Sequence, residues 1–314
     1  MTTSAIAVSG LRKAFGDKTV LDGIDLDVPA GTVFSLLGPN GAGKTTTVNV
    51  LTTLMTADAG TARVAGHDIA TETRAVRAVI GVTGQFAAVD ELLTGQENLQ
   101  LMADLKRLGP GEANRVVTGL LERFVLAESA QKLVSAYSGG MRRKLDLAMT
   151  LVGNPRIIYL DEPTTGLDPR SRRTMWDIIR QLVADGVTIF LTTQYLEEAD
   201  RLADRIAVLD QGRLVAQGTP GELKRQVPGS HVRLRFASVP ELGAAAQVLT
   251  GSTRDDEDLT LRVPSDGGLK SLRALLGHLD EHSIDPEDFS VHTPDLDDVF
   301  LALTGHANTE VNAQ

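Results

Sequence analysis

The sequence contains no cysteine, which excludes disulfide scaffolds, thiolate zinc sites and cysteine nucleophiles and fits a reducing cytoplasm. It also lacks the run of about 18 apolar residues that a membrane-spanning helix requires. Its most apolar stretches, Thr32–Leu37 and Val187–Leu191, have the length of a strand. The N-terminus, Met1 to Val8, has neither a basic start nor a long apolar stretch, so we expect no signal peptide. We therefore expect a chain that does not cross a membrane by itself.

Positive charge is scarce as well. The chain has 31 Lys and Arg against 41 Asp and Glu, a net charge of -10, and its pI is near 5.1. A protein that binds nucleic acid through the phosphate backbone needs a basic face, so this composition argues against that role. With 314 residues, of which 42% are hydrophobic and 23% charged, the chain can form one large folded domain and a small one.

The pattern of apolar residues predicts an α/β fold. Between Ile6 and Val28, short apolar runs alternate with polar turns, which is typical of antiparallel strands. Ile157–Leu160 and Val187–Leu191 are apolar on both faces, as expected for strands of a parallel sheet that helices cover. Further strands are predicted at Val33–Leu37, Thr61–Val64 and Val79–Val82, and helices at Thr45–Leu54, within Thr94–Leu151, at Arg170–Ala184 and at Leu196–Leu202. Strands that alternate with helices indicate the α/β class.

A cluster of residues that break regular structure, Val227–Ser230, predicts a domain boundary. We divide the chain there into residues 1–227 and a small α+β accessory domain of residues 228–314. The predicted elements of the accessory domain are two strands on either side of an acidic loop and then a helix, at His231–Phe236, Leu259–Val263 and Gly268–Leu279.

The last helix is predicted from its start signals. Thr293 can cap it, Pro294 suits the first helical position, and three aspartates follow where the positive helix end favours them. Its apolar residues share one face, namely Leu296, Val299, Phe300 and Leu303. We favour an intramolecular core as the partner of this face, and a second copy of the chain is the alternative.

The segment Gly38-Pro39-Asn40-Gly41-Ala42-Gly43-Lys44-Thr45-Thr46 matches the phosphate-loop pattern. It follows a predicted strand and opens a predicted helix, so its backbone N–H groups and the positive helix end can bind phosphate. Lys44 can reach the β- and γ-phosphates, and the Thr45 hydroxyl is placed to ligate magnesium. An accidental match of the four fixed positions occurs in roughly one percent of chains of this length. We therefore predict a site for a nucleoside triphosphate with magnesium.

The predicted strand Ile157–Leu160 ends in two carboxylates, Asp161 and Glu162. The carboxyl ends of parallel strands share one sheet edge, so both side chains are expected beside the phosphate loop. Asp161 is then placed to hold magnesium, directly or through water. Glu162 is placed to polarise the attacking water as a general base. A charged strand end before a turn is the alternative, and the phosphate loop in the same chain favours catalysis.

A third segment, Ser138-Gly139-Gly140, begins a predicted helix and offers a hydroxyl and free N–H groups to phosphate. An ordinary helix cap is the alternative. Together these segments resemble the ATP-binding subunits of ATP-binding-cassette (ABC) transporters over about Ile6 to Leu223. The motifs occur in the family's order, which is the phosphate loop, Gln85 in Gly81–Gln85, the signature Tyr137–Met141, Asp161-Glu162 and Pro163–Asp168.

The resemblance implies a P-loop NTPase core of ABC type, with an antiparallel β subdomain and a helical subdomain at about residues 86–151. It implies that the substrate is ATP with Mg2+, that Gln85 senses magnesium and the attacking water, and that Phe15 stacks against adenine. It also implies that the chain forms a homodimer on binding ATP. Each ATP would lie between the phosphate loop of one copy and Ser138, Gly139, Gly140 and Asp168 of the other.

One position departs from the family pattern. A histidine usually follows the switch strand, whereas this chain has Gln194 in Thr192-Thr193-Gln194-Tyr195. The glutamine amide can still donate a hydrogen bond to the γ-phosphate, but it cannot carry positive charge. We therefore expect hydrolysis that is active but slower than with histidine at this position. Together with the motifs above, this assigns the catalytic roles to Lys44, Gln85, Glu162 and Gln194.

Gln194, the Met141-Arg142-Arg143-Lys144 run and the tail Leu296–Leu301 are together similar to the daunorubicin/doxorubicin-resistance ATP-binding subunits of bacterial exporters. This similarity implies a peripheral ATPase at the cytoplasmic face of the cell membrane. It would power efflux of a hydrophobic drug or lipid-like substrate through a separately encoded permease, its only membrane contact, and bind no nucleic acid. The alternatives are a soluble non-transport ABC ATPase that acts on nucleic acid or ribosomes, and a subunit of an importer.

Overall fold

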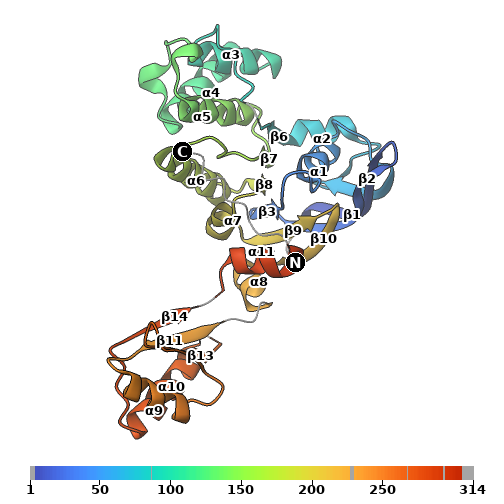
Figure 1. Ribbon diagram of the computed structural model, residues 1–314. Coiled ribbons are helices and arrows are strands. Elements are labelled where there is room, and N and C mark those ends of the chain that lie inside the picture. Colours follow the sequence, from blue (N-terminus) through green and yellow to red (C-terminus); the bar gives the residue numbers. More distant parts are fainter. Residues whose placement is uncertain (1–3, 86, 227–229, 267, 293, 306–314) are drawn as a thin grey trace. The chain divides into compact units, whose positions relative to one another are not determined.

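The computed structural model describes residues 4–85, 87–226, 230–266, 268–292 and 294–305. The chain forms two compact units, Met1–Pro220 and Gly221–Gln314 (Figure 1). The breaker cluster at 227–230 lies almost wholly outside the described residues, so the predicted domain boundary stays a prediction. None of the helices that the structure describes is both long enough and apolar enough to cross a membrane.

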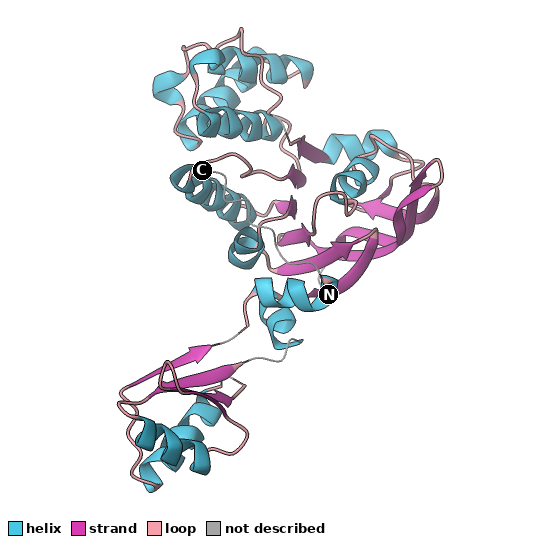
Figure 2. Cartoon of the chain, in the orientation of Figure 1, coloured by secondary structure: helices cyan, strands magenta, loops and turns pink. Residues whose placement is uncertain are grey.

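A six-stranded sheet forms the centre of the first unit (Figure 2). Its strand order is β10-β9-β3-β8-β7-β6, and β10 is the antiparallel strand at one edge of an otherwise parallel sheet. The strands are β3 (Val33–Leu37), β6 (Ile80–Thr83), β7 (Ile157–Asp161), β8 (Thr188–Thr193), β9 (Arg205–Asp210) and β10 (Arg213–Gly218). Every residue of β3, β7 and β8 is buried, which confirms the prediction of strands covered on both faces.

A second, antiparallel sheet in the order β2-β1-β4-β5 packs beside the first. Its strands are β1 (Ser4–Phe15), β2 (Lys18–Pro29), β4 (Ala59–Val64) and β5 (His67–Asp68), and helices α1 (Lys44–Leu51) and α2 (Thr73–Val79) belong to the same region. Leu26 of β2, Val48 of α1 and Phe34 of β3 share one buried cluster. This core fixes α1, and with it the phosphate loop, between the two sheets.

Helices cover the other face of the parallel sheet. They are α3 (Gly95–Leu105), α4 (Pro110–Arg123), α5 (Gly139–Leu151), α6 (Pro169–Ala184) and α7 (Leu196–Leu202), with short 3-10 turns at Ala127–Ser129 and Val134–Ala136. Leu145 of α5, Ile179 of α6 and Leu160 of β7 lie in one buried cluster. In Figure 1, α3, α4 and α5 gather at the end of the unit beside β6.

The second unit is an antiparallel sheet with helices, as the predicted α+β architecture requires. Its strand order is β12-β13-β11-β14, and Val232, Leu242 and Leu261 lie in its core. The strands are β11 (His231–Arg235), β12 (Thr253–Asp255), β13 (Thr260–Pro264) and β14 (Asp288–His292), and the helices are α8 (Pro220–Gln226), α9 (Val239–Val248), α10 (Leu269–Glu281) and α11 (Leu296–Thr304). Of these, α8, α9, β12 and β14 were not predicted.

The start of α11 corrects one prediction. Asp295, not Thr293, is the N-cap residue, Pro294 precedes the helix, and Thr293 lies outside the described residues. Asp295 Oδ1 accepts from the Asp298 N–H at 2.9 Å, and Asp298 Oδ2 accepts from the Asp295 N–H at 3.0 Å. This reciprocal capping satisfies two N–H groups at once and therefore sets the helix start. Leu296, Val299 and Phe300 are buried by the chain itself, which agrees with the favoured interpretation of this face.

Candidate functional site

The phosphate loop connects the central strand β3 to α1, and its path requires glycine. A Cβ atom on Gly38 would lie 2.3 Å from the Leu209 carbonyl oxygen. Gly43 has φ 113°, and a Cβ atom there would lie 2.9 Å from the Val20 carbonyl oxygen. Gly43 is also the N-cap residue of α1, and no side chain caps this helix. The first N–H groups of α1 can therefore bind an anion, because no side-chain oxygen of the described residues accepts from them.

Lys44 lies inside the loop with 5% of its surface exposed. Its Nζ donates to the carbonyl oxygens of Gly38 at 2.7 Å and Pro39 at 3.1 Å, and lies 3.5 Å from Glu162 Oε1. Burial lowers the pKa of Lys44, while the negative charges of Glu162 and Asp161 oppose that shift. The ammonium group is thus held at the mouth of the loop and paired with the proposed catalytic carboxylate.

Asp161 contacts both neighbouring elements of the site. Its Oδ2 accepts from the Thr45 hydroxyl at 2.9 Å, and its Oδ1 accepts from the Thr192 hydroxyl. The structure therefore brings together Thr45 and Asp161, two of the three predicted magnesium ligands. A hydroxyl and a carboxylate at the start of α1 are hard oxygen ligands of the kind that Mg2+ prefers, so these residues fit the ion.

Glu162 follows β7 directly and is buried. Its backbone lies in the left-handed region, at φ 50°, which costs roughly 1–2 kcal/mol for a residue other than glycine. The Glu162 N–H donates to the Thr192 carbonyl oxygen at 3.1 Å, and the Thr165 hydroxyl donates to Glu162 Oε2 at 3.3 Å. These contacts hold the strained backbone in place, and strain of this kind is typical of functional positions.

Gln194 and Gln85 lie at the same sheet edge. Leu37 is opposite Thr193 in the parallel pair of β3 and β8, and the Gly38 N–H donates to the Thr193 carbonyl oxygen at 3.3 Å. Gln194 is the next residue, so it lies beside the start of the phosphate loop. Gln85 is exposed two residues beyond the end of β6, which pairs with β7.

Phe15 ends β1, and 49% of its surface is exposed. The Lys13 Nζ lies 5.7 Å from the centroid of its ring. An exposed ring at the end of a strand is available to stack on a planar base. The assignment to adenine remains a prediction.

The signature segment does not join the phosphate loop within one chain. Ser138 is the N-cap residue of α5, and its Oγ accepts from the Met141 N–H at 3.3 Å. Asp168 caps α6 by accepting from the N–H groups of Arg170 and Ser171. A hydrogen bond from the Ser171 hydroxyl, together with these N–H bonds, lowers the pKa of Asp168. Among the described residues no hydrogen bond or ion pair connects Ser138 or Asp168 to the loop.

Arg143 was missed as a functional residue in the sequence. Its buried guanidinium extends from α5 and donates to the Gly84 carbonyl oxygen at 2.6 Å and the Pro163 carbonyl oxygen at 3.0 Å. It also donates to the carbonyl oxygens of Asp161 at 3.1 Å and Glu162 at 3.3 Å. One side chain therefore fixes the backbone around the two predicted site carboxylates, Asp161 and Glu162. Its acceptors are main-chain oxygens, which have no sequence signature.

Glu198 is a second buried charge that the sequence did not reveal. It lies on α7, four residues after Gln194, and has no exposed surface. Its Oε1 accepts from the Thr164 hydroxyl at 2.8 Å and from the Trp176 indole N–H at 3.1 Å. Burial raises the pKa of Glu198, although its hydrogen bonds oppose the shift. The carboxyl group thus connects α7, α6 and the segment that precedes Asp168.

Replacing Glu198 with leucine is expected to lower the free energy of unfolding by about 2–4 kcal/mol, because two buried donors lose their acceptor. Glu198→Gln keeps an acceptor for both donors and should lose less. Since the folded-state pKa of Glu198 is raised, its contribution is complete below the ordinary value of 4.5 and declines as pH rises through the folded value. Urea unfolding at about pH 5 and about pH 8 should show the deficit of Glu198→Gln shrinking as pH rises. A deficit that grows with pH would contradict this.

Comparison with known proteins agrees with this site. The ABC transporter family model matches residues 21–165. The daunorubicin resistance ATP-binding protein DrrA3 of Streptomyces coeruleorubidus is 50% identical over 307 residues, 97% of this chain and 97% of that protein. The daunorubicin/doxorubicin resistance ATP-binding protein DrrA of Streptomyces peucetius is 48% identical over 309 residues, which cover 97% of this chain and 93% of that protein.

A solved structure of an ATP-binding subunit of an ABC transporter matches with a TM-score of 0.64 and 29% identity, over 71% of this chain and 93% of that one. The predicted fold class and ATPase activity are thereby confirmed, while the roles of individual site residues stay predictions. The family is identified by sequence identity of 50% and 48% over 97% of the chain. The phosphate loop, the carboxylates and the sheet that positions them agree with it. The chain belongs to the ATP-binding, ATP-hydrolysing subunits of ABC transporters, in the group of the daunorubicin/doxorubicin-resistance proteins.

Proposed function

We propose that the chain powers export of a hydrophobic drug or lipid-like substrate through a separately encoded membrane subunit. The observation that carries the proposal is the convergence of Lys44, Thr45, Asp161 and Glu162 at the carboxyl ends of β3 and β7. The names of the relatives with 50% and 48% identity support drug export. In this proposal the chain lies at the cytoplasmic face of the membrane and contacts the bilayer only through its partner.

The nucleotide is bound by main chain and side chains together. The N–H groups of the loop and of the start of α1 bind the phosphates, Lys44 turns from the Gly38 carbonyl toward the β- and γ-phosphates, and Phe15 stacks on adenine. Thr45, Gln85 and Asp161 would hold Mg2+, which would neutralise phosphate charge. Asp161 Oδ2 already accepts from Thr45, so these two groups need little rearrangement.

Hydrolysis depends on Glu162 and Gln194. Glu162 accepts a proton from the water that attacks the γ-phosphorus, and the bond to the leaving β-phosphate oxygen breaks. Its carboxylate becomes available when Lys44, whose Nζ lies 3.5 Å from Glu162 Oε1, turns to the nucleotide. Gln194, beside the loop, donates from its amide to the γ-phosphate.

A second copy completes the site in this proposal. Ser138 and Gly139 are exposed at the start of α5, where a hydroxyl and helix N–H groups suit phosphate. With Gly140 and Asp168, they bind the nucleotide held by the partner, so two ATP molecules lie between two copies. ATP favours the closed dimer and hydrolysis favours its opening, which biases the membrane subunit between two states.

The shared site can be tested by mixing inactive subunits. Lys44→Ala subunits and Ser138→Arg subunits are each expected to lack ATPase activity when assembled with the membrane subunit. A mixed dimer contains one site with both defects and one site with neither, so partial turnover should return. Mixing Lys44→Ala with Lys44→Ala/Ser138→Arg subunits is the control, since no intact site can then form. Mixtures that remain inactive, despite proven heterodimers, would exclude the shared site.

Gln194→His is expected to raise ATP turnover about tenfold or less, because a protonated imidazole makes a charge-assisted bond to the γ-phosphate. The gain should diminish as pH rises and the imidazole loses its proton. Steady-state ATPase assays of wild type and variant between about pH 6 and pH 8.5 measure both effects. Equal turnover and ATP affinity throughout would show that the substitution at this position is immaterial.

A further inference from the structure

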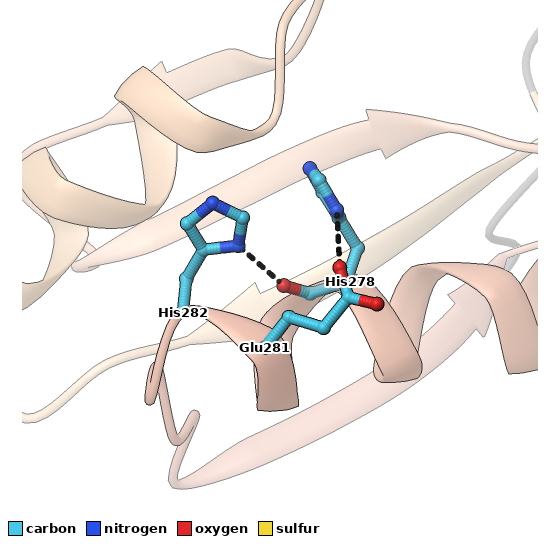
Figure 3. Close-up of side chains that lie close together, drawn as sticks. All are labelled: His278, Glu281 and His282. Carbon is cyan, nitrogen blue, oxygen red and sulfur yellow. Dashed lines mark hydrogen bonds and ion pairs between the residues drawn. The ribbon is translucent and has the colours of Figure 1, made fainter.

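Three potential metal ligands lie together at the C-terminal end of α10, namely His278 and Glu281 of the helix and its C-cap residue His282 (Figure 3). Five of the six histidines of the chain follow residue 230, so the second unit holds most of its imidazole groups. All three side chains are exposed, and one ligand atom of each lies within 4.8 Å of the others. Among the residues that the structure describes, this is the one group of three or more such ligands.

The spacing suits a single ion. Residues three and four apart on a helix are neighbours on its surface, and the rings of His278 and His282 have centroids 4.7 Å apart. His278 Nδ1 lies 3.6 Å from Glu281 Oε2. Two ligands of a tetrahedral zinc ion lie about 3.3 Å apart. Small rotations of exposed side chains are therefore enough to bring the three ligand atoms to one centre.

Two further features favour a cation at this place. His282 Nδ1–H donates to the His278 carbonyl oxygen at 2.9 Å, which leaves Nε2 as the nitrogen that can bind a metal. Metal-binding histidines commonly make this second hydrogen bond. In addition, the residues lie at the C-terminal end of a helix of 13 residues, where the negative end of the helix dipole attracts positive charge.

We propose that His278, Glu281 and His282 bind one divalent transition-metal ion, with Zn2+ as the best match. Two imidazoles and a carboxylate suit zinc, whereas Mg2+ prefers oxygen ligands alone. The ion keeps at least one open coordination position, and it crosslinks one turn of α10, the helix that contributes Leu279 to the core of the second unit. Binding therefore stabilises this unit and uses none of the residues of the nucleotide site.

The test is a calorimetric titration of the nucleotide-free full-length chain with ZnCl2, after EDTA treatment and without a polyhistidine tag. We expect one zinc ion per chain. His278→Ala and His282→Ala should each weaken binding by about tenfold or more, as loss of a ligand exceeds loss of its supporting contacts. The double variant should lose the site. Millimolar Mg2+ should leave zinc binding unchanged.

Two variants serve as matched controls, His67→Ala and His231→Ala. His67 Nδ1 lies 3.1 Å from Glu72 Oε1, and the ring centroids of His231 and His292 are 4.8 Å apart. Both variants should bind zinc as wild type does. Thermal unfolding in EDTA should be equal for wild type and the double variant, and zinc should raise the unfolding temperature of wild type alone. Absence of zinc binding in wild type, or equal binding by the double variant, overturns the proposal.

Discussion

Glu162→Gln is expected to reduce ATP turnover by about 10²–10⁴-fold while ATP binding is retained. The amide cannot accept a proton from the attacking water, and general-base catalysis contributes on this scale. The amide also removes the negative charge that lies 3.5 Å from Lys44 Nζ. Lys44 is then freer to bind phosphate, so the affinity for ATP should equal or exceed that of wild type.

Turnover and binding must be measured separately for this variant, by steady-state ATPase assay and by equilibrium binding of ATP with magnesium. Glu197→Gln is a suitable control, because Glu197 is exposed on α7 and pairs with Arg201 of the same helix at 3.0 Å. It should retain wild-type turnover. If Glu162→Gln turned over ATP within about threefold of wild type, Glu162 would not be the general base.

Lys44→Ala is expected to weaken ATP binding by roughly 10²–10⁴-fold. Two charge-assisted hydrogen bonds to phosphate are lost, at about 1.5–3 kcal/mol each. The substitution should also lower the stability of the protein without nucleotide. Glu162 is buried and would lose its cation, and an uncompensated buried charge is strongly destabilising. We therefore expect a lower free energy of unfolding together with the loss of binding.

The double variant Lys44→Ala/Glu162→Gln separates these two effects. Removing the carboxylate should restore part of the free energy of unfolding, while ATP binding stays weak, so the two substitutions are not additive in stability. Lys132→Ala is the control for a lost lysine, since Lys132 is exposed between the two 3-10 turns. Additive losses in urea unfolding would show that the Lys44–Glu162 pair does not stabilise the empty site.

The phosphate loop and the carboxylates were predictable from the sequence for a physical reason. Gly38 and Gly43 lie against backbone oxygens where no Cβ atom fits. The loop therefore requires glycine at these positions, and the sequence pattern shows it. Asp161 ends a strand of purely buried residues, and the parallel sheet then brings it to the loop. Local chemistry and strand order together determine this part of the site.

Other features have no such local signal. Arg143 donates to carbonyl oxygens of Gly84 and Pro163, which belong to distant segments. Every residue of β14 is exposed, so the burial pattern that predicts strands is absent there. Two strands, β9 and β10, and helix α9 also went unpredicted. Such elements are determined by tertiary pairing more than by their own residues.

The four hydrogen bonds of Arg143 to carbonyl oxygens have a mechanical consequence. They join α5, which begins with the signature segment, to the backbone of the loop that carries Asp161 and Glu162. A rotation of α5 cannot occur without moving that backbone or breaking buried, charge-assisted bonds. A force applied to α5 by another subunit would therefore shift the backbone that carries Asp161 and Glu162.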